Sequence, residues 1–114
     1  MVERRASIGQ KDEWMLIAEQ PKEVVGMVTI LLADDHVAVR RFIKILLREE
    51  VDFSVVGEAA NGIDAVKLVA ELKPDILVTD LTMPGLDGIE VTRQVRKGWP
   101  QTLVIILSMW DATR

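Results

Sequence analysis

Four short, mainly apolar runs divide the chain from residue 28 onward. They alternate with segments whose apolar residues recur every three or four positions, which is the spacing of an amphipathic helix. Short apolar runs that alternate with helical segments are typical of a parallel sheet with crossover helices. The pattern therefore predicts an α/β fold. The expected strands cover residues 28–33, 53–58, 76–79 and 102–107.

The segments between these runs predict three helices. The apolar stripe of the first helix is formed by Val39, Phe42, Ile43, Leu46 and Leu47. Its basic residues are expected to face water, and they are Arg40, Arg41, Lys44 and Arg48. Asn61, with Asp64 three residues later, predicts the start of a second helix, and Pro74 stops it. A third helix is expected over residues 88–97, before a break at Pro100.

Residues 1–26 precede this pattern. One interpretation is that Met27 is the true start of the protein and that the upstream residues come from an over-extended reading frame. The alternative is an extension that is disordered or forms a short helix, with Trp14 on its apolar face and Pro21 at its end. The chain has room for one domain, which we place at residues 27–114.

Composition excludes several classes of protein. Lysine and arginine total 14 and aspartate and glutamate total 18, so a net charge of −4 argues against a nucleic-acid-binding surface on this chain. No cysteine is present, which excludes disulfides and thiolate metal sites and is compatible with a reducing cytoplasm. The apolar runs are too short to span a membrane, and no secretory signal is evident. We therefore expect a cytoplasmic protein without membrane association.

Carboxylates follow two of the expected strands. Asp34 and Asp35 come directly after the first strand, and Asp80 follows the third. The carboxyl ends of strands are where open α/β sheets place their functional residues. Three carboxylates brought together there repel one another, so the cluster requires a divalent cation.

Two motifs surround these acids in the order expected of one family. The first runs from Ile30 to His36, with the sequence Ile-Leu-Leu-Ala-Asp-Asp-His, and the second runs from Pro74 to Gly88 and contains a Met-Pro-Gly turn. Together they resemble the receiver domain of bacterial two-component response regulators, in the subfamily whose receiver precedes a helix-turn-helix DNA-binding domain. The resemblance extends from about Met27 to the last residue. It implies a flavodoxin-like parallel sheet with helices on both faces.

The resemblance also implies a role for each candidate site residue. Asp80 accepts a phosphoryl group from a sensor histidine kinase or a small phosphodonor. Asp34, Asp35, Asp80 and the backbone carbonyl of Thr82 hold Mg²⁺, an ion that prefers oxygen ligands. Ser108 is the hydroxyl switch that donates to a phosphoryl oxygen. The output is regulation of transcription, through a domain that this chain does not contain.

Each of these residues also has a purely structural explanation. Asp80 could cap a turn, Asp34 and Asp35 could cap the first helix, and Ser108 could be an ordinary serine at a strand end. We favour the functional interpretation because the motifs occur together. His36 is the only histidine, and we interpret it as a residue of the first turn of a helix rather than as a ligand.

The chain departs from its family after the fourth strand. Receivers of this kind have five strands and five helices, whereas the pattern here ends after about four strands and three helices. The fifth strand normally brings a lysine to the active site, and no residue here can be assigned that role. The remaining sheet would expose a parallel-strand edge and apolar surface, so we predict marginal stability or self-association through that edge.

Two other functions compete with a phosphoacceptor module. A truncated remnant would fold in part and would not signal. An aspartate-nucleophile phosphatase would also attack phosphate from a strand-end aspartate beside Mg²⁺, but such enzymes have a second aspartate two residues later, where this chain has Thr82. We therefore expect a receiver that at most catalyses its own phosphorylation and dephosphorylation, and not an enzyme in the usual sense.

Overall fold

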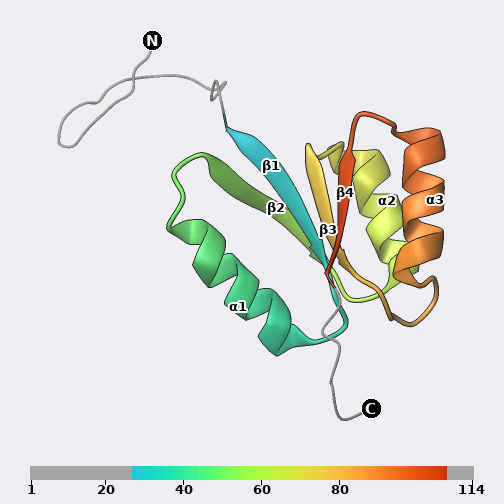
Figure 1. Ribbon diagram of the computed structural model, residues 1–114, viewed down its shortest axis with the longest axis horizontal. Coiled ribbons are helices and arrows are strands. Elements are labelled where there is room, and N and C mark those ends of the chain that lie inside the picture. Colours follow the sequence, from blue (N-terminus) through green and yellow to red (C-terminus); the bar gives the residue numbers. More distant parts are fainter. Residues whose placement is uncertain (1–26, 108–114) are drawn as a thin grey trace, which may run out of the picture.

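The sheet has four parallel strands in the order β2-β1-β3-β4 (Figure 1). This computed structural model describes residues 27–107. The strands are β1 (Val28–Ala33), β2 (Phe53–Ala59), β3 (Ile76–Asp80) and β4 (Leu103–Leu107). The short helix or disorder expected for residues 1–26 lies outside the described residues, as does Ser108. The strand order confirms the predicted α/β fold and places the carboxyl ends of β1 and β3 side by side.

Three helices connect the strands, namely α1 (Val37–Arg48), α2 (Gly62–Leu72) and α3 (Gly88–Gly98). Figure 1 shows α1 on one face of the sheet and α2 and α3 on the other. Within residues 27–107 no helix has the length and apolar character needed to cross a membrane. Four strands and three helices in this arrangement match an incomplete flavodoxin-like fold.

The helix ends follow local sequence signals. The side chain of Asn61 accepts a hydrogen bond from the N–H of Asp64 at 2.8 Å and caps α2, as predicted. Asp87 caps α3 through an equivalent bond of 2.9 Å. At the end of α2, Lys73 adopts a left-handed conformation with φ 46°, and the buried Pro74 follows it. Helix α2 packs against β1 and β2, and α3 packs against α2 and β4.

The main hydrophobic core lies between the sheet and the layer of α2 and α3. Alternate residues of β1 and β3 point into it, and the two helices contribute small and β-branched side chains. Its members are Leu31, Ala33, Ala59, Ala65, Val69, Leu77, Met83, Val91 and Val95. This core holds the sheet edge on which the functional site lies.

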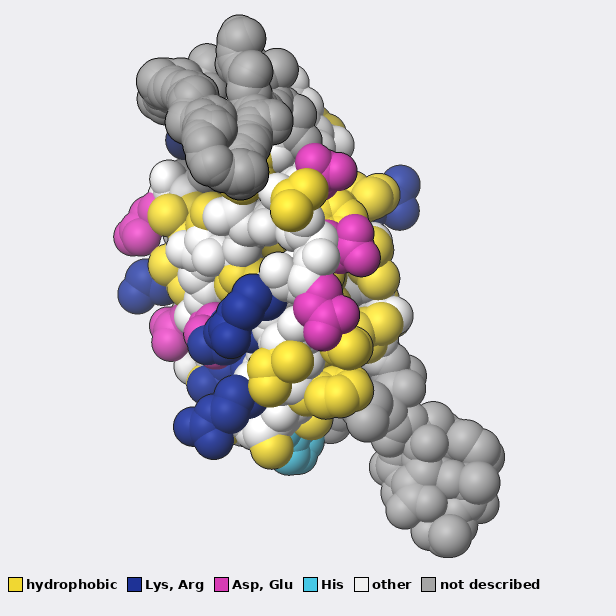
Figure 2. All heavy atoms as spheres, turned by 90° about the vertical axis from the view of Figure 1, so that its left-hand side faces the viewer, with side chains coloured by type: hydrophobic (Ala, Val, Ile, Leu, Met, Phe, Trp, Pro, Cys, Tyr) yellow, Lys and Arg dark blue, Asp and Glu magenta, His cyan; other side chains and the backbone are white. Residues whose placement is uncertain are grey.

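The opposite face of the sheet is less covered by the described residues. Helix α1 has no fully buried residue and packs mainly against β2. Hydrophobic side chains of α1 and of the edge strand β4 remain exposed, and we call this surface the α1-side apolar face. It comprises Phe42, Leu46, Leu103, Ile105 and Leu107. Figure 2, seen from the α1 side, shows hydrophobic side chains next to the basic residues of this helix.

The pairing of β1 with β2 contains one irregularity. Ile30 pairs with Val55 and Leu31 pairs with Gly57, which leaves Val56 as an extra residue in β2. Such an insertion is a β-bulge. Regular pairing then continues to the ends of both strands.

Candidate functional site

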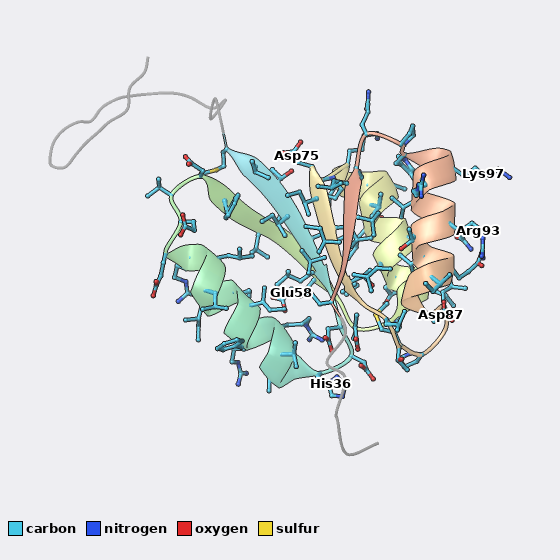
Figure 3. All side chains as sticks on the ribbon, in the orientation of Figure 1. His36, Glu58, Asp75, Asp87, Arg93 and Lys97 are labelled. Carbon is cyan, nitrogen blue, oxygen red and sulfur yellow. The ribbon has the colours of Figure 1, made fainter. Side chains whose placement is uncertain are left out.

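Four side chains with metal-binding atoms meet at the carboxyl edge of the sheet. Asp34, Asp35 and His36 belong to the loop between β1 and α1, and Asp80 ends β3. One ligand atom of each lies within 4.8 Å of those of the other three. Figure 3 shows His36 at this edge and Asp75 at the opposite end of the sheet. The structure thus brings the three predicted carboxylates together and adds a histidine to them.

Asp34 is held in place by hydrogen bonds along its backbone and side chain. Its N–H donates to the carbonyl of Ala59 at the end of β2, at 3.0 Å. Its Oδ1 accepts a bond from the N–H of His36 at 2.8 Å, an arrangement known as an Asx turn. The residue is only 6% exposed. Asp34 therefore shapes the turn that leads into α1, while its carboxylate stays within the acidic cluster.

His36 lies at the N-cap of α1 and not within its first turn, so that part of the prediction was wrong by one position. Its Nδ1 is 2.9 Å from Oδ1 of Asp34 and 3.1 Å from Oδ1 of Asp35. The hydrogen bond to Asp34 and the negative charges of Asp35 and Asp34 raise the pKa of His36. A protonated imidazole at this position partly neutralises the acidic pair. The Asp-Asp-His run is visible in the sequence, where it supports the family resemblance without indicating a contact between the imidazole and the carboxylates.

Asp80 occupies the tip of β3 in a partly buried position. Its Oδ1 accepts a hydrogen bond from the N–H of Leu81 at 2.8 Å. Burial and the negative charge of Asp34 raise the pKa of Asp80 above its usual value. Repulsion among these carboxylates is relieved when a proton or a divalent cation binds. The cluster can therefore hold a hard cation through oxygen atoms.

The loop after β3 can approach Asp80 closely because residue 88 is a glycine. The N–H of Gly88 donates to the carbonyl of Leu81 at 2.7 Å. A Cβ atom at position 88 would lie 2.5 Å from the carbonyl oxygen of Asp80, which is too close for any other residue without a shift. Within the same loop Met83 is buried in the core, and Gly85 has a φ of 83°. The Met-Pro-Gly turn therefore has a backbone role, since Gly85 permits a conformation that other residues avoid.

The structure describes one of the two remaining predicted site residues, Thr82, and not Ser108. Thr82 lies two positions after Asp80, in an exposed part of the loop. Ser108 lies outside the described residues, one position beyond Leu107, which pairs with Asp80. The metal-binding role of Thr82 and the switch role of Ser108 stay predictions.

Sequence reasoning missed a pair of residues beside the cluster. Arg40 was expected to face water, but its side chain is only 14% exposed. Its Nη1 donates to the carbonyl of Asp34, and its Nε donates to Oε1 of Glu58 at 2.9 Å. Figure 3 shows Glu58 between β2 and α1. Arg40 and Glu58 are 18 positions apart. No helical or strand periodicity links residues at that separation, so their contact could not be predicted from the pattern.

The comparisons with known proteins agree with this geometry. The family model of the response regulator receiver domain matches residues 30–114. The transcriptional regulatory protein LiaR of Bacillus subtilis is 40% identical over 82 residues, which cover 72% of this chain and 39% of that protein. The oxygen regulatory protein NreC of Staphylococcus aureus is 41% identical over 83 residues, which cover 72% and 38%. The chain thus spans about two fifths of the length of these relatives.

Solved structures show the same fold. A two-component response regulator of the LuxR family from Aurantimonas superposes with a TM-score of 0.70 at 39% identity, covering 75% of this chain and 61% of that one. A DNA-binding response regulator of the LuxR family from Staphylococcus aureus gives a TM-score of 0.70 at 30% identity, covering 75% and 71%. Family model, relatives and fold agree. The chain belongs to the response regulator receiver domain family, and it is a signalling module rather than a conventional enzyme.

Proposed function

We propose that this receiver accepts a phosphoryl group on Asp80 as part of a two-component phosphorelay. The observation that carries the proposal is the convergence of Asp34, Asp35 and Asp80 at the carboxyl edge of the sheet. Membership of the receiver family supports it, because Asp80 occupies the strand-end position that the resemblance assigns to the phosphoacceptor. The aspartate is partly buried, next to other carboxylates, and its backbone is packed against Gly88.

The chemistry requires one carboxylate oxygen and no general base. An oxygen of Asp80 forms a bond to phosphorus while the bond between phosphorus and the donor's leaving atom breaks. The leaving atom is an imidazole nitrogen if the donor is a phosphohistidine, or an oxygen if it is a small acyl phosphate. The product is an acyl phosphate on Asp80. Because phosphoryl transfer depends mainly on positioning and charge neutralisation, the remaining residues act as holders of charge.

The described side chains fit a magnesium ion. Asp34, Asp35 and Asp80 supply carboxylate oxygens, and the backbone carbonyl of Thr82 would complete the protein's ligands. Burial and the negative charge of Asp34 raise the pKa of Asp80, and a bound cation would relieve the repulsion between these carboxylates. When bound, Mg²⁺ neutralises the acidic cluster and the incoming phosphoryl oxygens. In the same proposal, the hydroxyl of Ser108 donates to one of those oxygens.

The partner and the output follow from the relatives. A receiver takes its phosphoryl group from a sensor histidine kinase or from a small phosphodonor. Relatives such as LiaR are named as transcriptional regulatory proteins, so we propose that phosphorylation of this receiver regulates transcription in the cytoplasm through an output domain outside these 114 residues. The net charge of −4 argues against DNA binding by the receiver itself.

The test is the intact mass of the purified chain after incubation with Mg²⁺ and acetyl phosphate, a small acyl phosphate. We expect a single phosphoryl adduct that requires Mg²⁺ and is absent in Asp80→Asn. Asp52→Asn is the matched control, because it removes a carboxylate just before β2, at the other end of the sheet. This variant should form the adduct as the wild type does.

Two results would contradict the proposal. One is a folded wild-type chain that forms no adduct, which would favour the non-signalling remnant. The other is continuous release of inorganic phosphate from a phosphomonoester substrate without a stable adduct, which would favour a phosphatase.

A further inference from the structure

We propose that Arg40 is a positioning residue that links Asp34 to β2 through Glu58 and so fixes the loop between β1 and α1 for cation binding. This inference rests on the proposed function of the acidic cluster. Nothing in the periodicity of α1 distinguishes Arg40 from its basic neighbours. Its contacts and its burial do.

The contacts form a closed ring of three elements. Nη1 of Arg40 donates to the carbonyl of Asp34, and Nε of Arg40 donates to Oε1 of Glu58 at 2.9 Å. Glu58 precedes Ala59, whose carbonyl accepts the N–H of Asp34 at 3.0 Å. The ring therefore runs from the end of β1 to α1, then to β2, and back to β1. Both backbone polar groups of Asp34 are held within it.

The guanidinium of Arg40 has a geometry that suits this task. Its N–H groups lie in one plane and point in several fixed directions, so one side chain can hold a carbonyl and a carboxylate together. A lysine ammonium at the same position is a point charge on a flexible stem and cannot reproduce both bonds. The task thus depends on the shape of the group as well as on its charge.

Lys44 provides the internal comparison. Its Nζ donates to Oε2 of Glu58 at 2.7 Å, so it shares the carboxylate with Arg40. The side chain of Lys44 is 34% exposed, against 14% for Arg40, and only Arg40 also reaches the backbone of Asp34. Loss of Lys44 removes one bond of Glu58 and leaves the ring intact.

The hydrogen-bonded ring affects the acidic cluster because the loop between β1 and α1 is short, so a movement of Asp34 is passed on to Asp35. Asp34 and Asp35 are consecutive, and a shift of the Asp34 carbonyl moves the peptide that carries Asp35. Arg40 acts on the ligands through this peptide and is therefore a positioning residue. Partners that orient metal ligands in this way typically change metal affinity by about 10–100-fold when they are removed.

The experiment compares the wild type with Arg40→Gln, Arg40→Lys and Lys44→Gln, each as the full chain. Two readouts are followed as Mg²⁺ is raised: the increase in Tm, and the fraction that carries a phosphoryl adduct after incubation with acetyl phosphate. We expect both Arg40 variants to need about tenfold more Mg²⁺ for half of the effect in each readout. Lys44→Gln should keep the wild-type Mg²⁺ dependence even if its Tm without metal is lower.

The outcomes separate the inference from the proposed function. If the wild type responds to Mg²⁺ and the Arg40 variants need no more of it, the inference is wrong and the function stands. Equal impairment of Lys44→Gln, or full rescue by Arg40→Lys, would also overturn the inference, because charge or general stability would then explain the effect. A wild type that binds Mg²⁺ without accepting phosphate would refute the function, while the shift in Tm still decides the role of Arg40. A wild type that does not respond to Mg²⁺ at all would refute both.

Discussion

At the scale of single residues, the surroundings of Asp80 disfavour its ionised form. It is partly buried and close to the carboxylates of Asp34 and Asp35, and only the imidazole of His36 lies among them as a source of positive charge within the described cluster. The raised pKa of Asp80 expresses the free energy that its ionisation costs the folded chain. The same charge arrangement favours binding of a cation and, after that, of a phosphoryl group.

Asp80→Asn should therefore stabilise the chain at neutral pH when Mg²⁺ is removed. A carboxyl group whose pKa rises on folding binds more protons in the folded state, so stability falls as pH rises from its usual pKa of 3.8 through the higher folded value. The variant removes this cost and should raise the free energy of unfolding by about 0.5 kcal/mol, a value reduced by solvent screening. Urea unfolding in EDTA at pH 7 should show the gain.

The gain should shrink as the pH falls towards 3.8 and disappear below it, where the wild-type carboxyl is protonated in both states. Added Mg²⁺ should reduce or reverse it at pH 7, because the cation binds the wild type better. A variant that is less stable than the wild type in EDTA would contradict the expectation that ionisation of Asp80 costs the folded chain free energy.

The sequence was sufficient to find the acidic cluster but not its surroundings. Asp34, Asp35 and Asp80 could be predicted because they directly follow apolar strands whose carboxyl ends must share an edge. His36 was assigned one position too far into the helix, and Arg40 was assigned to water. Both errors concern side chains whose contacts depend on how the turn and β2 are folded, which no helical spacing encodes.

At the scale of elements, apolar periodicity located every strand and helix of residues 27–107 with small differences at the ends. β1 covers residues 28–33 as predicted, whereas β4 begins at Leu103 and not at 102. The side chain of Thr102 donates to the carbonyl of Pro74 at 2.7 Å, so this residue closes the turn before the strand. Helix α1 starts two residues before Val39, because the turn at Asp34 already directs the chain into the helix.

The attachment of α1 to β2 should depend on pH through Glu58. The hydrogen bonds from Lys44 and Arg40 lower the pKa of Glu58 below its usual 4.5. A carboxylate whose pKa falls on folding stabilises the protein above its usual pKa, and this contribution is lost as pH falls through the lower folded value. Glu58→Gln should lower the free energy of unfolding by about 1 kcal/mol at pH 7. The loss is modest because Glu58 and Lys44 are partly exposed to solvent.

The difference between Glu58→Gln and the wild type should shrink as the pH falls below 4.5, when measured by urea unfolding. Glu71→Gln, on the exposed side of α2, serves as the control and should change stability little at either pH. A cost that is the same at pH 7 and in acid would show that the ion pair does not provide the stability.

The two ends of α3 should respond oppositely to alanine. Gly88→Ala places a Cβ 2.5 Å from the carbonyl oxygen of Asp80 and 2.9 Å from Cα of Leu81, so the backbone must shift. We expect Gly88→Ala to lower the free energy of unfolding by about 2 kcal/mol and to reduce the fraction of the chain that carries a phosphoryl adduct. Gly98→Ala meets no atom within 4 Å and should stabilise the helix by up to about 1 kcal/mol. Thermal unfolding distinguishes the two, and equal stability of the variants would contradict the packing argument.

At the scale of the whole molecule, the two faces of the sheet differ in how the described residues cover them. Helices α2 and α3 bury one face, whereas the α1-side apolar face leaves Leu103, Ile105 and Leu107 of the edge strand exposed. An uncharged, apolar edge strand can pair with another strand. The exposed edge predicted from the sequence is thus present within residues 27–107, at β4.

We expect the chain of 114 residues to self-associate through this edge, as sedimentation velocity over a range of concentrations would show. Ile105→Lys should weaken the association by about tenfold or more, since it places a charge on the α1-side apolar face. Val51→Lys is the control, because Val51 is 85% exposed but lies in the turn before β2. A monomer at every concentration, or equal effects of the two lysines, would exclude the edge as the contact.

The extra residue Val56 also decides which side of the sheet receives a charge. Side chains alternate along a strand, so without the bulge Glu58 would lie on the opposite face from Val55, which is the core face to which Ala59 contributes. The bulge shifts the phase of β2 by one residue, and the strand can then present Ala59 to the core and Glu58 to α1. We expect deletion of Val56 to preserve both orientations in a regular ladder. A further insertion beside Val56 would exchange the orientations of Glu58 and Ala59 and bury an unpaired carboxylate. This strand should therefore tolerate a deletion at the bulge but not an insertion.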